Sequence, residues 1–556
     1  MSKSLVIIPT AKLVPIELQA EFGSISPAMI PLDGRPALHY IIDQYSDTEF
    51  LVAIHEAGDA LKAYVDRRVE HRSIEVHDVG ITCSLGETLL NAIQSHKSIP
   101  ERLVINFADT AVNGVSTEKD CIHFAKKEEV FRWTTFTTNH SGQILAINEK
   151  ETEKANGVIS EMVFIGIFCF IHPKAFIDIL TECVKESGDI DPFYKAVQTY
   201  SEKYVLNFHE ATDWYDFGHL DTYYDSRKRI SSTCREFNTI DVDSSRGRIT
   251  KHSRNADKFI DEIQWYLKLP QKLLHIAPRV FDYDLDRKSP MVEMEFYGYP
   301  VLNDLYLYGD LDLGAWARIF RSIEQALSDM REFKLTSESA ADVTSACIKM
   351  YETKTLDRIN QYKELPDFCW ANQSGLQING AMVMTLNEVI EQLPQVLTHS
   401  GLCDTKDLSV IHGDPCLSNI LFDRRNGIVR MIDPRGRFGS YDIYGDPLYD
   451  WAKLSHSIEG DYDFLVNDLF DFEINGSQVE LTPHLSSNHI AIKNLYHQRV
   501  IDHLGINEHL RIRLLESLLF LSMIPLHGDR PRSQQAFLAR GLWLFSEIRD
   551  KFTSAA

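Results

Sequence analysis

The stretch VIHGDPCLSNILFD, at positions 410–423, holds side chains of the types that phosphoryl transfer uses. Asp414 can orient an acceptor hydroxyl, and Asn419, five positions later, can reach a metal ion from the end of the same loop. Asp433 follows the apolar run IVRMI, so we expect it at a strand end that points back at this loop. A surface turn in which Asp414 caps local amides is the alternative interpretation.

A cation for the phosphates and a carboxylate to hold it lie upstream of this stretch. Lys251 in RITKHS is predicted on a strand, from which it can reach the phosphates of ATP. Glu262 in DEIQWY is predicted on the next helix, where it can pair with Lys251. A solvated lysine and an exposed acidic helix face are the plainer alternatives. His412 is interpreted as a brace for the loop, and Asp450 as a residue that orders it.

The segments HGDPCLSN and MIDP resemble the signature of the aminoglycoside phosphotransferase and choline kinase family, which has a two-lobed, protein-kinase-like α+β fold. GDPLYDWAKL is similar to the acidic helix start of that family, and the resemblance covers roughly 235–556. It implies ATP and Mg²⁺, with catalytic Asp414, metal ligands Asn419 and Asp433, and cofactor-binding Lys251 and Glu262. One departure is the turn VDSSRGR, which offers only Gly247 where a glycine-rich phosphate cover is expected.

The first part of the chain alternates short apolar runs with helical spacing. SLVIIPT, FLVAIH, IEVHDV and RLVINFADT indicate buried strands, and PALHYIIDQY, ALKAYVDRRVEHR and ETLLNAIQSHK indicate helices between them. This alternation predicts a doubly wound α/β domain, with helices on both faces of a mostly parallel sheet. FRWTTFTTN, GQILAINEK, EMVFIGIFCF and YVLNFHEA are predicted to add strands and make the sheet mixed.

Two aspartates end predicted strands in this part: Asp109 in LVINFADT and Asp216 in DWYDFGHLD. Together with ISPAMIPLDGRPALHYIIDQ, SLGETLLNAI, AINEK and VFIGIFCF they resemble, in order, the sugar-1-phosphate nucleotidyltransferases over roughly 1–230. The resemblance implies that Asp109 and Asp216 hold magnesium between phosphates. It also implies that Lys150 neutralises the sugar phosphate and that Gly166 lies on the sugar side.

The loop PTAKLVPIELQAEFG departs from that family, whose first loop is rich in glycine and carries a catalytic arginine. Here no glycine precedes Gly23, and Lys12 is the nearby cation that remains for a triphosphate. The proline–lysine pair of the family reads Ser26-Pro27. The residues that would bind the triphosphate are thus lost, whereas those that would bind the sugar phosphate remain. This difference predicts altered or lost pyrophosphorylase chemistry.

Length and composition bound these interpretations. A chain of 556 residues is too long to fold around a single hydrophobic core. The polar run SRKRISSTCREFN predicts a boundary that gives domains 1–232 and 233–556. In the second domain, a small sheet-rich lobe is predicted to precede a larger helical lobe, with a cleft between them. The net charge of −23 makes nucleic acid a poor partner. No membrane-length apolar window and no signal peptide are found, and nine scattered cysteines favour free thiols in a cytoplasmic protein.

The sequence therefore predicts a cytoplasmic bifunctional enzyme. One domain phosphorylates a small hydroxyl compound (a sugar, polyol or amino alcohol) with ATP. The other, similar to nucleotidyltransferases, binds the sugar phosphate or activates it with a nucleoside triphosphate. The resemblances imply precursors of capsule or other bacterial surface polysaccharides. The alternatives are an active kinase with a first domain that only binds a nucleotide sugar, and a scaffold in which both folds are degenerate. The acceptor, the nucleotide preference and the oligomeric state stay open.

Overall fold

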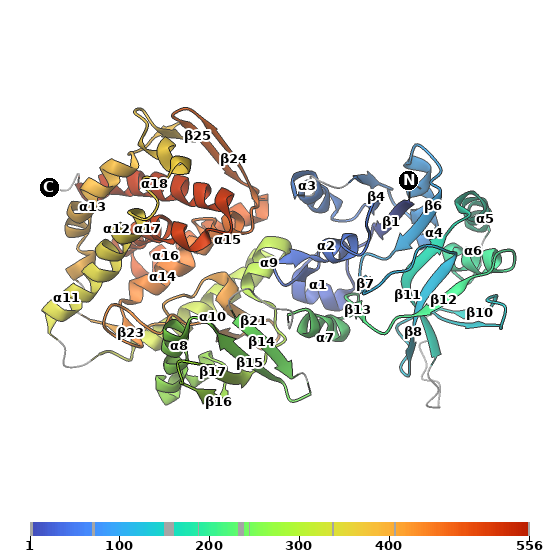
Figure 1. Cartoon of the computed structure of the whole chain (residues 1–556), viewed down its shortest axis with the longest axis horizontal. Coiled ribbons are helices and arrows are strands. Elements are labelled where there is room, and N and C mark those ends of the chain that lie inside the picture. The colour runs from blue at the N-terminus through green and yellow to red at the C-terminus, as the bar shows by residue number, and fades with distance from the viewer. Residues whose placement is uncertain are drawn as a thin grey trace. The chain divides into compact units, whose positions relative to one another are not determined.

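The computed structural model describes residues 4–68, 73–149, 161–186, 188–231, 238–243, 245–335, 339–404 and 407–553. The chain divides into two compact units (Figure 1). Unit 1 comprises Met1–Ile230 with Tyr308–Asp310, and unit 2 comprises Ser231–Leu307 with Leu311–Ala556. In the described part of the chain, no helix is both long enough and apolar enough to span a membrane.

A nine-stranded mixed sheet forms the centre of unit 1. The main path runs β10-β9-β11-β6-β1-β4-β5, and β8 pairs with β11 and β12. Strands β6, β1, β4 and β5 are parallel, whereas β11 runs antiparallel to β6. The strands are β1 (Ser4–Thr10), β4 (Thr48–Ile54), β5 (Ile74–Asp78), β6 (Arg102–Asn106), β8 (Cys121–Lys127), β9 (Thr135–Thr138), β10 (Ile144–Asn148), β11 (Glu161–Phe170) and β12 (Asn207–Glu210).

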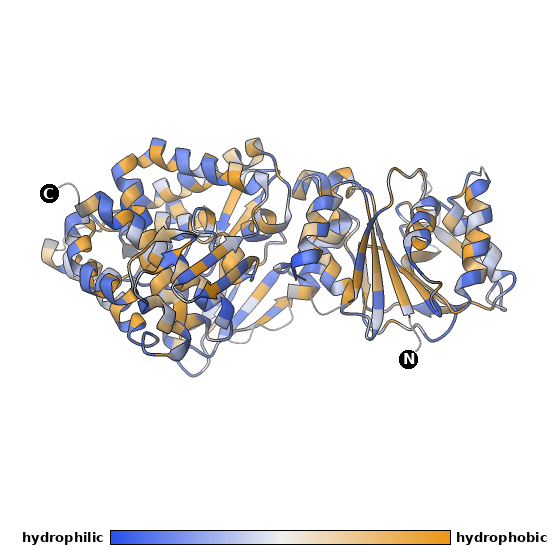
Figure 2. Ribbon diagram, turned by 90° about the horizontal axis from the view of Figure 1, so that it is seen from above, coloured by the Kyte–Doolittle hydropathy of each residue, from blue (hydrophilic) through white to orange (hydrophobic). Residues whose placement is uncertain are grey.

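Helices cover both faces of this sheet, as the alternating pattern predicts (Figure 1). One side carries α4 (Leu85–Ser95), α5 (Pro173–Lys185) and α6 (Pro192–Ser201), and the other carries α1 (Ile16–Phe22), α2 (Ala37–Ile42) and α7 (Leu220–Ser231). Helix α3 (Gly58–Arg68) connects β4 to β5. Apolar side chains from α4, α5 and α6 join those of the sheet in one buried core. Figure 2 shows how apolar residues concentrate along the strands. The prediction of a mixed α/β sheet is confirmed.

Unit 2 begins with a four-stranded antiparallel sheet in the order β14-β15-β17-β16. Its strands are β14 (Asn238–Asp243), β15 (Arg248–Ser253), β16 (Val280–Asp284) and β17 (Met291–Glu295). Helix α8 (Ala256–Lys268) follows β15 and buries Phe259, Ile263 and Tyr266, whose spacing puts them on one helical face. This sheet carries Lys251 and this helix carries Glu262, two of the predicted site residues.

The rest of unit 2 is mostly helical, with short hairpins between the helices. The helices are α9 (Leu302–Tyr308), α10 (Leu313–Arg331), α11 (Ala340–Ile348), α12 (Lys354–Ile359), α13 (Leu386–Ser400), α14 (Pro447–Ile458), α15 (Tyr462–Val466), α16 (Ser487–Leu504), α17 (Ile506–Met523) and α18 (Pro531–Thr553). The short strands are β18 (Gln377–Ile378), β19 (Ala381–Met382), β20 (Ser409–Val410), β21 (Ile420–Asp423), β22 (Ile428–Met431), β23 (Tyr444–Gly445), β24 (Phe470–Asn475) and β25 (Gln478–Pro483).

The apolar residues of the segment DFLVNDLFDF have helical spacing, but only the first part of this segment forms a helix. Helix α15 ends at Val466, and Phe470–Asn475 forms strand β24, which pairs with β25. The turn between the two strands contains Asn475-Gly476, and Gly476 has a φ of 61°. Asparagine followed by glycine is a strong local signal for a hairpin, and it overrides the helical spacing of the apolar residues before it.

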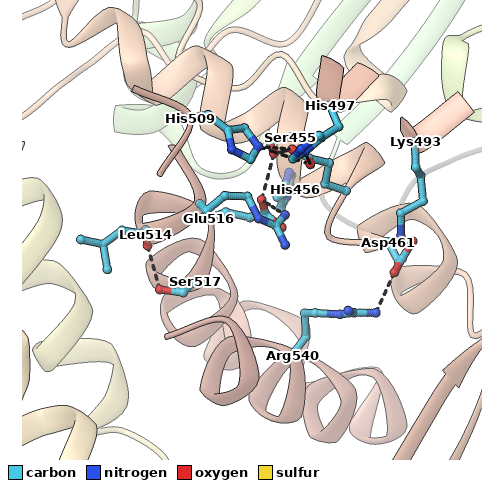
Figure 3. A network of polar contacts seen from close by, with 12 residues as sticks. Ser455, His456, Asp461, Lys493, His497, His509, Leu514, Glu516, Ser517 and Arg540 are labelled. Carbon is cyan, nitrogen blue, oxygen red and sulfur yellow. Dashed lines mark hydrogen bonds and ion pairs between the residues drawn. The ribbon is translucent and has the colours of Figure 1, made fainter. Parts of the chain in front are cut away.

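A polar network joins the C-terminal helices of unit 2 (Figure 3). His497 Nδ1 lies 2.7 Å from a carboxylate oxygen of Glu459, and His509 Nε2 lies 3.1 Å from the other. Glu516 Oε2 accepts hydrogen bonds from Ser455 at 2.9 Å and from Arg513 at 2.6 Å. Because these residues come from α14, α16 and α17, or from the residue after α14, the network fixes the three helices against one another.

The His497–Glu459 pair predicts a pH dependence of stability. The hydrogen bond to Glu459 raises the pKa of His497 above its ordinary value of 6.5. The stabilisation by protonated His497 is therefore complete below pH 6.5 and is lost as the pH rises through the higher pKa of the folded state. We expect His497→Gln to flatten the decline in denaturation midpoint above that pH. His399→Gln, which changes an exposed histidine, should leave the decline unchanged; an equal effect of both variants would contradict the prediction.

Candidate active site

The loop that contains Asp414 runs between strands β20 and β21, and a residue of helix α14 holds it in place. The buried carboxylate of Asp450 accepts the backbone N–H of His412 at 2.8 Å and that of Gly413 at 2.7 Å. Gly413 has a φ of 80°, and a Cβ atom there would lie 2.7 Å from Cβ of Arg435. A buried acid that binds two consecutive amides fixes the backbone of the loop directly before Asp414.

His412 is a neutral brace in this loop. Its ring is fully buried, and burial lowers its pKa to about 4. Its Nδ1 atom accepts the backbone N–H of Asp414 at 3.2 Å, and its ring packs against that of Trp265 in a T-shaped arrangement at a centroid distance of 5.4 Å. A histidine that stays uncharged at neutral pH and binds the backbone positions Asp414 rather than exchanging protons with a substrate.

Asp414 forms an ion pair with Lys453 of helix α14, at 2.8 Å from Nζ to Oδ1. Burial would raise the pKa of Asp414, but Lys453 outweighs burial and lowers it to about 2, so the carboxylate is ionised at neutral pH. The side chain of Asn419 donates Nδ2–H to the carbonyl oxygen of Asp414 at 2.9 Å. That bond engages the nitrogen of the amide and leaves Oδ1 as its potential metal ligand.

Lys251, Glu262 and Asp433 meet at one point. Lys251 Nζ lies 2.7 Å from Glu262 Oε1 and 2.8 Å from Asp433 Oδ1, and its side chain is only 7% exposed. Burial alone would lower the pKa of Lys251, but the carboxylates of Asp433 and Glu262 outweigh it and raise that pKa. The lysine is therefore charged and held in one position by two acids.

Asp433 is placed by its backbone as well as by Lys251. It adopts a left-handed conformation with φ of 57°, and its N–H donates to Tyr266 Oη at 3.0 Å. The preceding residue, Ile432, donates its N–H to the carbonyl oxygen of Asn419 at 2.9 Å. Asp433 and Asn419 thus lie on adjoining segments and supply only oxygen ligands, the kind that Mg²⁺ prefers. These two residues fit a magnesium ion that accompanies a nucleotide.

Residues that the sequence interpretation did not assign lie next to Asp414. Besides Lys453, Tyr449 of α14 accepts hydrogen bonds through its Oη atom from Lys354 Nζ at 3.3 Å and from Arg435 Nη1 at 3.1 Å. One signal for Lys453 was available, because it follows Asp450 by three residues on the same helical face. Lys354 belongs to the distant helix α12, and no local pattern relates it to the loop.

In unit 1 the structure brings Asp109 and Asp216 together. Strand β7 (Thr110–Val112) pairs antiparallel with β13 (Trp214–Asp216), so Asp109 lies directly before one strand and Asp216 ends the other. A Cβ atom at Gly218 would lie 2.5 Å from Asp109 Oδ2 and 3.3 Å from Asp216 Oδ1, so only glycine fits between the two acids. These oxygen ligands also fit magnesium.

The Asp216 carboxylate is held by three donors from its own turn and the following helix. Its Oδ1 accepts the N–H of Gly218 at 2.9 Å, and its Oδ2 lies 3.0 Å from His219 Nδ1 and 2.8 Å from Thr222 Oγ1. These contacts fix the orientation of the carboxylate next to Asp109.

The other predicted site residues of unit 1 are placed differently. Gly166, with φ of 91°, lies in β11, and its carbonyl oxygen accepts the N–H of Phe107 at 2.9 Å. A Cβ atom there would lie 2.7 Å from the side chain of Phe107, two residues before Asp109. Lys12 is exposed on the loop between β1 and α1. Lys150 lies outside the described residues, so its predicted role stays a prediction.

Similar solved structures cover less than half of the chain. No protein-family model matches it, and no curated protein sequence matches it. A UDP-glucose pyrophosphorylase complexed with UDP-glucose shares 14% identity over 42% of this chain and 100% of its own, with a TM-score of 0.35. A nucleoside-diphosphate-sugar pyrophosphorylase from Vibrio cholerae shares 13% over 40% and 99%, with a TM-score of 0.34. The CTP:phosphocholine cytidylyltransferase of Streptococcus pneumoniae shares 8% over 41% and 100%, with a TM-score of 0.32.

Proposed function

We propose that unit 2 is an ATP-dependent phosphotransferase that acts on a hydroxyl group of a small molecule. The observation that carries the proposal is the meeting of Lys251 with Glu262 and Asp433, beside the loop that holds Asp414 and Asn419. A fixed cation, oxygen ligands for a metal and an ionised carboxylate are the groups that phosphoryl transfer from ATP requires. The buried contacts of Asp450 to this loop also favour a built site over a surface turn.

In the proposed reaction the oxygen of the acceptor hydroxyl attacks the γ-phosphorus of ATP. The bond from that phosphorus to the β–γ bridging oxygen breaks, and its electron pair leaves with ADP. Asp414 orients the hydroxyl and accepts its proton, while Lys251 binds phosphate oxygens and Glu262 holds Lys251 in place. A magnesium ion bound by Asn419 and Asp433 would supply positive charge at the phosphates.

For unit 1 we propose a role with the phosphorylated product, as a domain that binds the sugar phosphate or activates it with a nucleotide. The adjacency of Asp109 and Asp216 around Gly218 supports a phosphate-and-magnesium site. The two activities would then be successive steps toward a precursor of capsule or another surface polysaccharide, in a bifunctional cytoplasmic enzyme.

A second candidate, in which unit 1 only binds its ligand, is favoured by the loop after β1. Between Thr10 and Gly23 there is no glycine, and Pro15 directly precedes the short helix α1. Backbone amides that approach a triphosphate closely normally need glycine, and proline has no N–H to offer. This loop therefore favours loss of triphosphate chemistry.

The proposal for unit 2 predicts that MgATP raises the melting temperature of the full chain. A ligand at 100 times its Kd stabilises the folded state by about 2.7 kcal/mol. Asp433→Asn should remove most of the shift, because it weakens both the metal site and the anchor of Lys251. Asp414→Asn should keep it, because Asp414 faces the acceptor. Absence of a shift in the unchanged, folded protein at millimolar MgATP would refute nucleotide binding.

The second candidate, in which unit 1 only binds its ligand, predicts tighter binding of sugar phosphates or nucleotide sugars than of free nucleoside triphosphates. Each lost charge-assisted contact costs about 1.5–3 kcal/mol, so two losses weaken triphosphate binding by a few powers of ten. Calorimetry on the full-length Asp433→Asn protein separates this binding from that of unit 2. Asp109→Asn added to that background should reduce magnesium-dependent binding. Micromolar triphosphate affinity in unit 1, or release of pyrophosphate with a sugar phosphate, would contradict the prediction.

A further inference from the structure

A group of basic side chains surrounds Tyr449 beside Asp414, in a chain whose net charge is −23. This basic cluster consists of Lys354 and Arg358 from α12, Lys453 from α14, and Arg435 from the segment after β22. Lys354 and Arg435 bond to the hydroxyl of Tyr449, and Lys453 bonds to Asp414. Arg358 donates to the carbonyl oxygen of Ser522 at 2.8 Å. All four residues are partly exposed.

The carboxylates that pair with the basic cluster do not balance its positive charge. Among the residues that the structure describes, Lys453 is the only member in an ion pair with a carboxylate, that of Asp414. Lys354, Arg358 and Arg435 bond instead to a phenol and to backbone carbonyl groups. By contrast, where the nucleotide is proposed to bind, Lys251 alone contacts two carboxylates.

The pKa values of Lys354 and of Tyr449, which the cluster surrounds, reflect the same excess of positive charge. Burial lowers the pKa of Lys354 to about 7, and repulsion from Arg435, Arg358 and Lys453 adds to that effect. Burial would raise the pKa of Tyr449, but Lys354, Arg435 and Lys453 outweigh it and lower the pKa to about 7. An anion that enters this place would relieve the repulsion between the cations.

We propose that the acceptor carries an anionic group, a phosphate or a carboxylate, in addition to the hydroxyl that receives the phosphoryl group, and that the basic cluster binds this anion. The inference rests on the proposed function of unit 2 and narrows its substrate class. Asp414 faces the acceptor, and Lys453, which bonds to it, shares helix α14 with Tyr449, so the cluster lies on the acceptor side. A cationic amino alcohol would meet like charges there and is disfavoured.

Matched acceptors test the class directly with the full chain and MgATP. ADP formation is measured with glycerol 3-phosphate, glycerate, glycerol and ethanolamine, which differ mainly in charge. We expect one of the two anions to exceed glycerol and ethanolamine at least tenfold in kcat/KM, and the winner identifies phosphate or carboxylate. Equal or faster reaction with glycerol or ethanolamine would overturn the inference while leaving the kinase proposal standing.

A matched pair of variants then locates the anion. Lys354→Met removes one charge of the cluster, and Lys349→Met removes an exposed charge five residues earlier. Charge-assisted contacts of this kind are worth roughly tenfold to a hundredfold in affinity. Lys354→Met should raise the acceptor KM by that factor with the KM for ATP unchanged, whereas Lys349→Met should change neither. A rise in the KM for ATP instead would assign the cluster to the nucleotide and overturn the inference.

A binding measurement separates failure of this inference from failure of the proposed function. Absence of both an MgATP melting shift and ADP formation would refute the function itself. Inorganic phosphate is then titrated into the full chain by calorimetry, without nucleotide. Binding that Lys354→Met weakens and Lys349→Met preserves would still support an anion site in the cluster. No binding, or equal binding by both variants, would overturn it.

Discussion

Replacement of Asp414 by asparagine is expected to reduce ADP formation by about 10²–10⁴-fold, the range that a positioned acid–base group contributes. The change removes the charge that orients the acceptor hydroxyl and takes its proton, and it keeps the size of the side chain. It also releases Lys453, whose Nζ lies 2.8 Å from the carboxylate. The KM for ATP and the MgATP melting shift should stay close to those of the unchanged protein.

The control for this variant is Asp423→Asn, which alters an aspartate at the end of the next strand. Asp423 binds the amides of Arg425 and Asn426 in the turn of its own hairpin and has no place in the proposed chemistry. An Asp414→Asn protein with near-normal turnover, or one that loses nucleotide binding along with activity, would contradict the role assigned to Asp414.

Replacement of Asp450 by alanine is expected to produce the largest loss of stability among the site residues. The carboxylate is 2% exposed and accepts two backbone N–H groups. Each buried amide that loses its partner costs about 1–3 kcal/mol, so the free energy of unfolding of unit 2 should fall by about 2–6 kcal/mol. Activity should fall too, because the loop before Asp414 loses its support.

Replacement of Asp450 by asparagine should keep one of the two hydrogen bonds to the loop and lose the other. Its amide oxygen can accept one N–H while its NH₂ group opposes the other, so Asp450→Asn should lie between alanine and the unchanged protein. Asp357→Ala, on an exposed position of α12, is the matched control and should have little effect. Denaturant unfolding followed by the fluorescence of the buried Trp265 checks both. A loss below 1 kcal/mol for Asp450→Ala would show that the loop is held by other contacts.

Local signals were sufficient to predict much of the fold. The apolar run SLVIIPT matches β1, and the alternation of such runs with helical spacing predicts the layered sheet of unit 1. Lys251 and Glu262 were predicted on a strand and the helix after it, and the structure joins them by an ion pair. Such pairs are accessible to sequence reasoning because both partners belong to consecutive elements.

Contacts between distant elements could not be predicted in the same way. The basic cluster takes Lys354 from α12 and Arg435 from a segment some eighty residues later, and no periodicity relates the two. The adjacency of Asp109 and Asp216 also depends on the pairing of β7 with β13 across about a hundred residues. It was predicted from a family resemblance and not from spacing. The charge balance around a site depends on such long-range contacts, so the acceptor class could be addressed only with the structure.

Transfer of label from [γ-³²P]ATP by the full chain tests the central claim most directly. The protein is incubated with Mg²⁺ and the acceptor panel, and labelled products are separated from ATP and inorganic phosphate. We predict a labelled, phosphorylated acceptor with the unchanged protein and a loss of about 10²–10⁴-fold with Asp414→Asn. Labelled product formed equally well by Asp414→Asn, or no product from any acceptor by a protein that binds MgATP, would contradict the assignment of unit 2 as a phosphotransferase built around Asp414.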